Sequence, residues 1–171
     1  MKRAILLSML FASTAVAAQT NYVSVTPVVD TSAYATKDSV GGVQALSLIS
    51  CNNQRRGKIT SVVLSDKSGN AVEYNILTFR TNPAGTFNDQ GTVDPTDADL
   101  LSLNPVINIA STDCFTFNDN GVCSLSSLKS NVVSAVTSSL PGTLYVVIQA
   151  IGTPTYASSS DVTLTIGFEC D

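Results

Sequence analysis

The 171-residue chain contains no histidine and no tryptophan, and only nine Lys and Arg. Without histidine the commonest general base is missing, and neither a Ser-His-Asp nor a Cys-His catalytic arrangement can be formed. The only cluster of cations is Arg55, Arg56 and Lys58, which is too small to hold a nucleic-acid backbone. These absences argue against a nucleophilic hydrolase and predict that nucleic acid is not a partner.

Charged residues are scarce, at 13% of the chain. Glutamate occurs only at Glu73 and Glu169 and lysine is sparse, although both residue types are common in helix-rich domains. Ser, Thr and Asn fill the polar positions instead, and small hydroxyl and β-branched residues suit a pleated sheet. The composition therefore favours an exported β-protein over a helical cytoplasmic one.

The N-terminus predicts a secretory signal peptide over residues 1–18. Met1-Lys2-Arg3 is basic, Ala4 to Val16 is uncharged and mostly apolar, and small residues follow. This apolar run is shorter than the roughly 20 residues of a membrane-spanning helix. An uncleaved anchor and an ordinary buried segment are the alternatives. Cleavage after Ala17 or Ala18 would leave one domain, residues 19–171, with no membrane contact and a charge of −6, from seven basic (nine minus two) and thirteen acidic residues.

Hydrophobic periodicity predicts an all-β fold. Asp161–Cys170 alternates apolar and polar residues, as in a strand with one dry face, whereas Thr143–Ile151 is nearly continuously apolar, as in a strand covered on both faces. Pro27 marks an edge strand. The other predicted strands are Tyr22–Val29, Val43–Ser50, Lys58–Leu64, Ala71–Phe79, Val106–Ile109, Cys114–Phe117 and Val122–Leu125. We predict a β-sandwich or jelly roll of about seven to nine mostly antiparallel strands, with at most one short helix.

The segments between the strands predict turns, loops and one short helix. Gly41-Gly42 is expected to break the chain before the second strand, and Ser65–Asn70 to close a hairpin between the strands on either side. Arg80–Asp99 reads as an unusually long loop. Leu100–Leu103 is predicted as a helical turn capped by Asp97 or Asp99. Ser126–Ser139 is ambiguous, because its apolar spacing is helical but its residues are weak helix formers.

Four cysteines, Cys51, Cys114, Cys123 and Cys170, remain after signal removal. An even number in an exported protein favours disulfides, although free buried thiols stay possible and a metal site is disfavoured by the absence of His and Cys-x-x-Cys. The turn signal at Asn118–Gly121 favours pairing Cys114 with Cys123. Cys51–Cys170 would then join an early strand to the last one.

Carboxylates are the remaining candidates for chemistry. A pair of them could act as general acid and base, and oxygen ligands in a loop could hold calcium. The spacing fits neither an EF-hand nor any fixed pair, so turn and cap roles are the main expectation, with no cofactor. Tyr34, Tyr145 and Tyr156 could mark a sugar platform, but packing in the core or at its rim is favoured. The candidate carboxylates are Asp89, Asp94, Asp97, Asp99 and Asp113.

Turn and strand motifs over most of the mature chain resemble a family of small proteins encoded by tailed bacteriophages. The first group is Val25–Ala35 with Asp38 and Gly41-Gly42. The later groups are Ile59–Val62, Asp97–Leu100, Thr143-Leu144-Tyr145, Gly152–Ser158, Ser160-Asp161 and Leu164. Members of that family are virion structural components of the capsid-decoration or head-fibre kind. The resemblance implies no functional residues.

The leading hypothesis is a non-enzymatic virion protein, a capsid decoration or minor head component. It would act through contacts with the major capsid protein, other virion proteins or further copies of itself. Arg80–Asp99 and the turn Arg55–Lys58 are the expected contact points. The first alternative is an exported bacterial adhesion or ligand-binding domain, periplasmic or at the surface, which the signal peptide and disulfides favour. The second is a carboxylate hydrolase.

Overall fold

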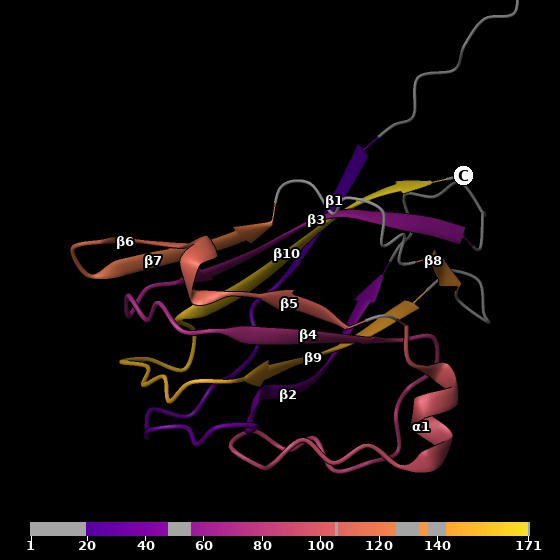
Figure 1. The fold of residues 1–171 in the computed structure, drawn as a ribbon, viewed down its shortest axis with the longest axis horizontal. Coiled ribbons are helices and arrows are strands. Elements are labelled where there is room, and N and C mark those ends of the chain that lie inside the picture. Colours follow the sequence, from indigo (N-terminus) through magenta and orange to yellow (C-terminus); the bar gives the residue numbers. More distant parts are fainter. Residues whose placement is uncertain (1–19, 48–55, 105, 126–133, 137–142, 171) are drawn as a thin grey trace, which may run out of the picture.

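The computed structural model describes residues 20–47, 56–104, 106–125, 134–136 and 143–170. These residues form two antiparallel sheets packed face to face (Figure 1). The prediction of an all-β sandwich with one short helix is confirmed. The signal peptide lies outside the described residues and stays a prediction.

The larger sheet has six strands. Its order is β1 (Thr20–Val25), β10 (Val162–Cys170), β3 (Arg56–Asp66), β7 (Asn120–Leu125) and β6 (Cys114–Phe117), with β8 (Ser134–Val136) also pairing β3. The smaller sheet has the order β2 (Ser39–Ser47), β9 (Thr143–Ala150), β4 (Tyr74–Phe79) and β5 (Ile107–Ile109).

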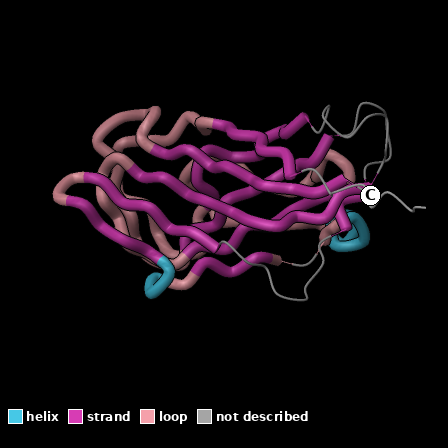
Figure 2. The backbone as a smooth tube through the Cα atoms, turned by 90° about the horizontal axis from the view of Figure 1, so that it is seen from above, coloured by secondary structure: helices cyan, strands magenta, loops and turns pink. Residues whose placement is uncertain are grey.

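Successive strands cross repeatedly from one sheet to the other. β1, β3 and β10 lie in the larger sheet, whereas β2, β4 and β9 lie in the smaller one. This winding is that of a jelly roll, which is common among viral capsid and lectin domains. The described connections that cross between the sheets, residues 26–38, 67–73, 110–113 and 151–161, gather at one end of the sandwich, where Figure 2 shows a cluster of loops.

The hairpin predicted between Lys58–Leu64 and Ala71–Phe79 is wrong. Both strands exist, as β3 and β4, but β3 pairs with β10, β7 and β8, while β4 pairs with β9 and β5. The turn residues between them do reverse the chain, and they carry it to the opposite sheet. Turn chemistry fixes the reversal, whereas the pairing partner depends on strands distant in sequence.

Two further local predictions need correction. Gly41 and Gly42 do not precede the second strand but lie inside it, with φ of 75° and 71°, where the register against β9 shifts. These angles favour glycine and form a bulge that bends the strand. The short helix α1 (Asp97–Ser102) is capped by Thr96, not by Asp97 or Asp99. Asp99 is the third helical residue and completes a capping box with Thr96.

The main core lies between the sheets and follows the predicted alternation. Val162, Leu164, Ile166 and Phe168 of β10 are all buried, at 2% exposure or less. They pack with inward residues of the smaller sheet, such as Ile76, into one cluster. The dry face predicted for this strand is confirmed.

The hairpin of β6 and β7 confirms both the turn signal and one disulfide. Phe117 pairs with Asn120 across the two-residue turn, and Cys114 is bonded to Cys123 directly opposite. Cys51 lies outside the described residues, so its pairing with Cys170 stays a prediction. The tail of the ambiguous segment 126–139 contains β8, and residues 126–133 and 137–139 are outside the described residues.

Candidate interaction surface

The five aspartates singled out from the sequence do not gather into one site. Asp94 and Asp97 are exposed, and Asp113 accepts a hydrogen bond from the Ala110 N–H at 3.1 Å, closing its own turn. Within the described ranges, no three residues among His, Cys, Asp and Glu come together. The remaining two, Asp89 and Asp99, hold loops in place.

Asp89 ties the segment after β4 to the start of the smaller sheet. One oxygen accepts from the Tyr34 hydroxyl and from the Gly41 N–H, both at 2.6 Å, and the other accepts from the Asp30 N–H at 2.7 Å. Burial, followed by the hydrogen bond to Asp89, raises the pKa of Tyr34. This carboxylate is therefore fully engaged within the fold.

Asp99 has the same kind of role at the other end of that segment. It is 5% exposed and accepts from the N–H groups of Ala84 and Gly85 and from the Thr96 hydroxyl, at 2.8 to 2.9 Å. Burial alone would raise the pKa of Asp99, but the hydrogen bonds from Ala84, Thr96 and Gly85 outweigh it, and the net pKa is lowered.

The segment held by these two anchors covers part of the outer face of the smaller sheet. We call residues 81–95 the covering segment. Phe87 from this segment is 4% exposed and packs edge-to-face on Phe79 of β4, with ring centroids 5.7 Å apart. Leu77 and Val147 complete this second apolar cluster. The strand β9 thus packs on the main core with one face and, at Val147, on this second cluster with the other, as its nearly continuous apolar sequence predicts.

A polar network that the sequence patterns did not predict joins the β3–β4 and β9–β10 connections. Asp161, 6% exposed, accepts from the Ser68 hydroxyl at 2.6 Å and from the Ala157 and Ser158 N–H groups at 2.9 Å. Asp66, 2% exposed, accepts from the Ser68 N–H at 2.7 Å and from the Asn70 side chain at 2.8 Å. Asp-x-Ser at 66–68 is a turn signal that could have revealed part of this network.

The pKa values of these two carboxyls move in opposite directions. Burial raises the pKa of Asp66 despite its hydrogen bonds. Burial also opposes ionisation of Asp161, but the bonds from Ser68, Ser158 and Ala157 lower its pKa overall. Their oxygens accept bonds from neighbouring loops, so the network holds the loops together. A shallow pocket of about 460 Å³ lies beside it, lined by Lys67, Ser68, Asp119, Thr155, Tyr156 and Ala157.

The tyrosines considered as a sugar platform are packing residues. Tyr34 and Tyr156 are 2% and 1% exposed, and their rings meet edge-to-face at 5.3 Å. Tyr156 also shares a hydroxyl contact of 3.2 Å with Tyr74. Tyr145 is half-buried against the second cluster. Packing in the core and at its rim, the favoured interpretation, is confirmed.

The outer face of the larger sheet is different, because no described segment covers it. Side chains that alternate with the core residues point outward, and register places them in neighbouring rows across five strands. We call this set the open face. It consists of Tyr22, Ser24, Thr26, Ser61, Val63, Ser65, Phe115, Phe117, Val122, Ser124, Thr163, Thr165 and Gly167.

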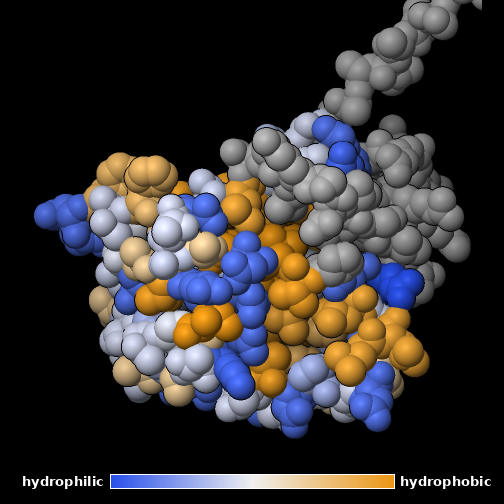
Figure 3. Space-filling view, in the orientation of Figure 1, coloured by the Kyte–Doolittle hydropathy of each residue, from blue (hydrophilic) through white to orange (hydrophobic). Residues whose placement is uncertain are grey.

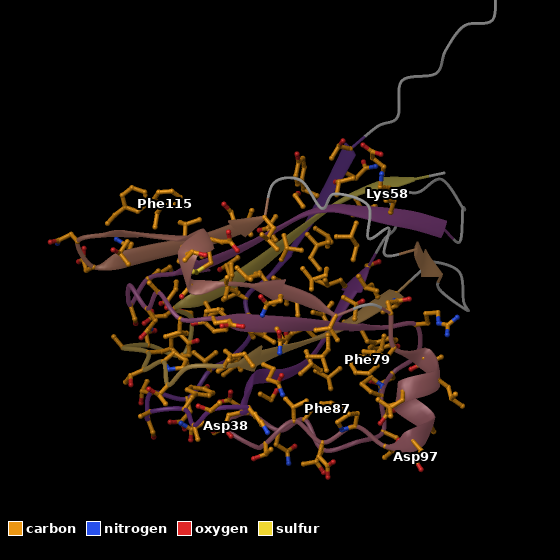
Figure 4. All side chains as sticks on the ribbon, viewed as in Figure 1. Asp38, Lys58, Phe79, Phe87, Asp97 and Phe115 are labelled. Atoms are coloured by element: carbon orange, nitrogen blue, oxygen red, sulfur yellow. A yellow bond between two sulfur atoms is a disulfide. The ribbon has the colours of Figure 1, made fainter. Side chains whose placement is uncertain are left out.

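Aromatic residues stand at both edges of the open face. Phe115 and Phe117 on β6 are 68% and 62% exposed, and Tyr22 on β1 is 67% exposed. The Tyr22 ring lies over Gly167, where an added Cβ would meet the ring at 3.0 Å and would also collide with the Ser61 hydroxyl oxygen. Figure 4 shows Phe115 directed away from the sandwich, and Figure 3 shows apolar surface over this hairpin with hydrophilic atoms at its tip.

The disulfide fixes which way these phenylalanines point. Cys114 and Cys123 face the core, and Cys123 is 1% exposed. Because alternate residues of a strand point to opposite sides, Phe115 and Phe117 must face solvent. The crosslink therefore holds an exposed aromatic pair on a short edge strand.

The contact role predicted for Arg80–Asp99 and for Arg55–Lys58 stays a prediction, and the structure shows where part of each segment lies. The loop Arg80–Asp99 contains the covering segment and lies against its own sheet. Lys58 belongs to β3, opposite Glu169 of β10, and Arg55 lies outside the described residues. No helix among the described ranges has the length and apolarity to cross a membrane.

Comparisons with known proteins place the chain in no family. No family model matches it, and no curated protein matches. Among solved structures it is similar to a chain titled Desmodium yellow mottle tymovirus, with a TM-score of 0.29 and 10% sequence identity. That match covers 95% of this chain and 93% of the other.

Proposed function

We propose that this protein is a non-enzymatic structural component of a bacteriophage virion, a capsid decoration or minor head protein that works through subunit contacts. The observation that carries the proposal is the open face, a broad outer sheet surface that no described segment covers and that exposes Phe115 and Phe117. Exposed apolar side chains gathered on a rigid element mark interaction sites more often than catalytic ones.

Two further observations support a contact role. The buried carboxylates Asp66, Asp99 and Asp161 each accept several hydrogen bonds within the fold, which favours a structural role over acid–base chemistry. The jelly-roll winding is shared with viral capsid domains, an analogy at the level of fold. The turn and strand motifs that resemble phage virion proteins point the same way.

The second candidate is an exported adhesion or ligand-binding domain. The Cys114–Cys123 disulfide favours it, because disulfides persist in oxidising compartments outside the cytoplasm. Jelly rolls also include lectin domains. This candidate shares the requirement for an accessible surface and differs in the partner.

Purified particles separate the two candidates. Virions from a producing strain are banded by density, washed in high salt and assayed for the protein with an antibody. We expect the wild-type protein to remain with the particles and the double variant F115S/F117S to be lost from them. A protein found only as a free periplasmic monomer, with saturable glycan binding, contradicts the virion role and supports the adhesion role.

A further inference from the structure

We propose that the open face is a contact between two copies of this chain, packed sheet against sheet. This inference rests on the proposed structural function and names its surface and partner. Part of the opposite outer face, around Leu77, Phe79 and Val147 of the smaller sheet, is closed by the covering segment of the same chain. No described segment lies on the open face.

Charge favours a second copy over a charged partner. The chain is acidic, with a formal net charge of −4. The central part of the open face is uncharged, and Lys58 and Glu169, which continue its rows at one end, are register neighbours of opposite sign. Two acidic molecules therefore meet on this face with little repulsion, while a strongly charged partner would find nothing to pair with.

Four hydroxyls of the open face, those of Ser24, Thr26, Thr163 and Thr165, are already paired with one another. Ser24 and Thr165 share a hydrogen bond of 2.8 Å across β1 and β10, and Thr26 and Thr163 share one of 3.0 Å. Burying a polar group is costly when it loses its partner, and these groups would keep theirs in a dry interface. The same pairing leaves fewer free donors and acceptors for a sugar.

The shape and size of the face fit sheet-on-sheet packing. Small side chains dominate its centre, which allows a second sheet to approach to about 10 Å, while the aromatic side chains stand at the edges. Five strands of about six residues cover a projected area of about 500 Å². Stable interfaces bury about 800 Å² on each partner, so the contact should be reversible and concentration-dependent.

The absence of native tryptophan provides a direct test. In the variant Phe115→Trp, the single indole reports on the open face. In the control variant Leu101→Trp, it reports on a site on α1 outside that face, where the native leucine is 80% exposed. Emission is recorded over a concentration series alongside sedimentation velocity. We expect a blue shift at position 115 that follows dimer formation, and no shift at position 101.

Substitutions then test the energetics of the contact. F115S/F117S should weaken dimerisation by about tenfold or more, as expected for paired aromatic anchors, and T165E should abolish it by placing like charges together. The control L101S should leave it unchanged. Circular dichroism confirms that each variant keeps the β fold.

The possible outcomes separate this inference from the proposed function. Dimers whose position-115 emission does not shift, or which survive T165E, overturn the open face as the self-contact. A chain that stays monomeric at all concentrations but remains on particles overturns the self-contact and leaves the virion role standing. A monomer that is also absent from particles contradicts both.

Discussion

The two sheets of this sandwich differ most on their outer faces. The outer face of the smaller sheet is a second core, in which Phe79, Leu77 and Val147 lie under Phe87 of the covering segment. The outer face of the larger sheet holds paired hydroxyls and exposed aromatic side chains. The outer face of the smaller sheet thus contributes to stability, and we propose that the outer face of the larger sheet serves as a contact surface.

The strand sequences record this difference. β9 reads TLYVVIQA, with apolar side chains directed to both sides, because both sides are covered. β10 reads VTLTIGFEC, and its threonines and glycine fall on the open face. Strands covered on both faces are nearly continuously apolar, whereas a strand with one open face alternates.

The largest effect should come from removing the ring that closes the covered face. We expect Phe87→Ala to lower the free energy of unfolding by about 3–4 kcal/mol, because it removes a buried aromatic side chain and leaves a cavity. Phe115→Ala, the same substitution on the open face, should change it by less than about 0.5 kcal/mol. Urea unfolding of both variants measures the difference. Equal losses would show that the two faces are alike.

A smaller effect should follow from removing the crosslink beneath the open face. Cys114 and Cys123 are nine residues apart. Closing a loop of that length lowers the conformational entropy of the unfolded chain and so stabilises the folded protein by roughly 2.5 kcal/mol. C114A/C123A should lose about that amount and loosen the hairpin that carries Phe115 and Phe117. Hydrogen exchange localises the loss, and protection should fall in β6 and β7 while the covering segment is unaffected. A loss spread evenly over both sheets would contradict this assignment.

The smallest effect concerns pH and the anchor of the covering segment. The pKa of Asp99 is lowered in the folded protein, so the unfolded chain takes up its proton first. Its stabilisation is complete above the ordinary Asp pKa of about 3.9 and is lost as pH falls through the lowered value. Asp99→Asn should therefore flatten the fall in stability below about pH 4.

Asp97→Asn, an exposed neighbour in the same helix, is the matched control and should keep the wild-type acid dependence. Thermal unfolding followed by circular dichroism at a series of pH values provides the measurement. An Asp99→Asn curve parallel to that of the wild type would show that this carboxylate does not hold the segment.

Part of the site was predictable from residue types alone. The Asn118–Gly121 turn between two cysteines indicated the disulfide-linked hairpin, and period-two alternation indicated which residues of β10 face outward. The role of Asp89 was not predictable, because its partners Tyr34 and Gly41 lie about fifty residues earlier. The aspartates drew attention as candidate ligands, and the fold uses Asp89 and Asp99 as anchors.

Local sequence patterns indicated most of the strands, the dry side of β10 and the turn at Asn118–Gly121, because these features depend on side chains a few residues apart. Contacts between distant strands place β3 and β4 in opposite sheets and β1 beside β10, and they bring residues 81–95 over part of one outer face while no described segment covers the other. The reason is physical: Ser24 and Thr165 meet across 141 positions, and no local pattern specifies which distant strand completes a hydrogen-bond ladder.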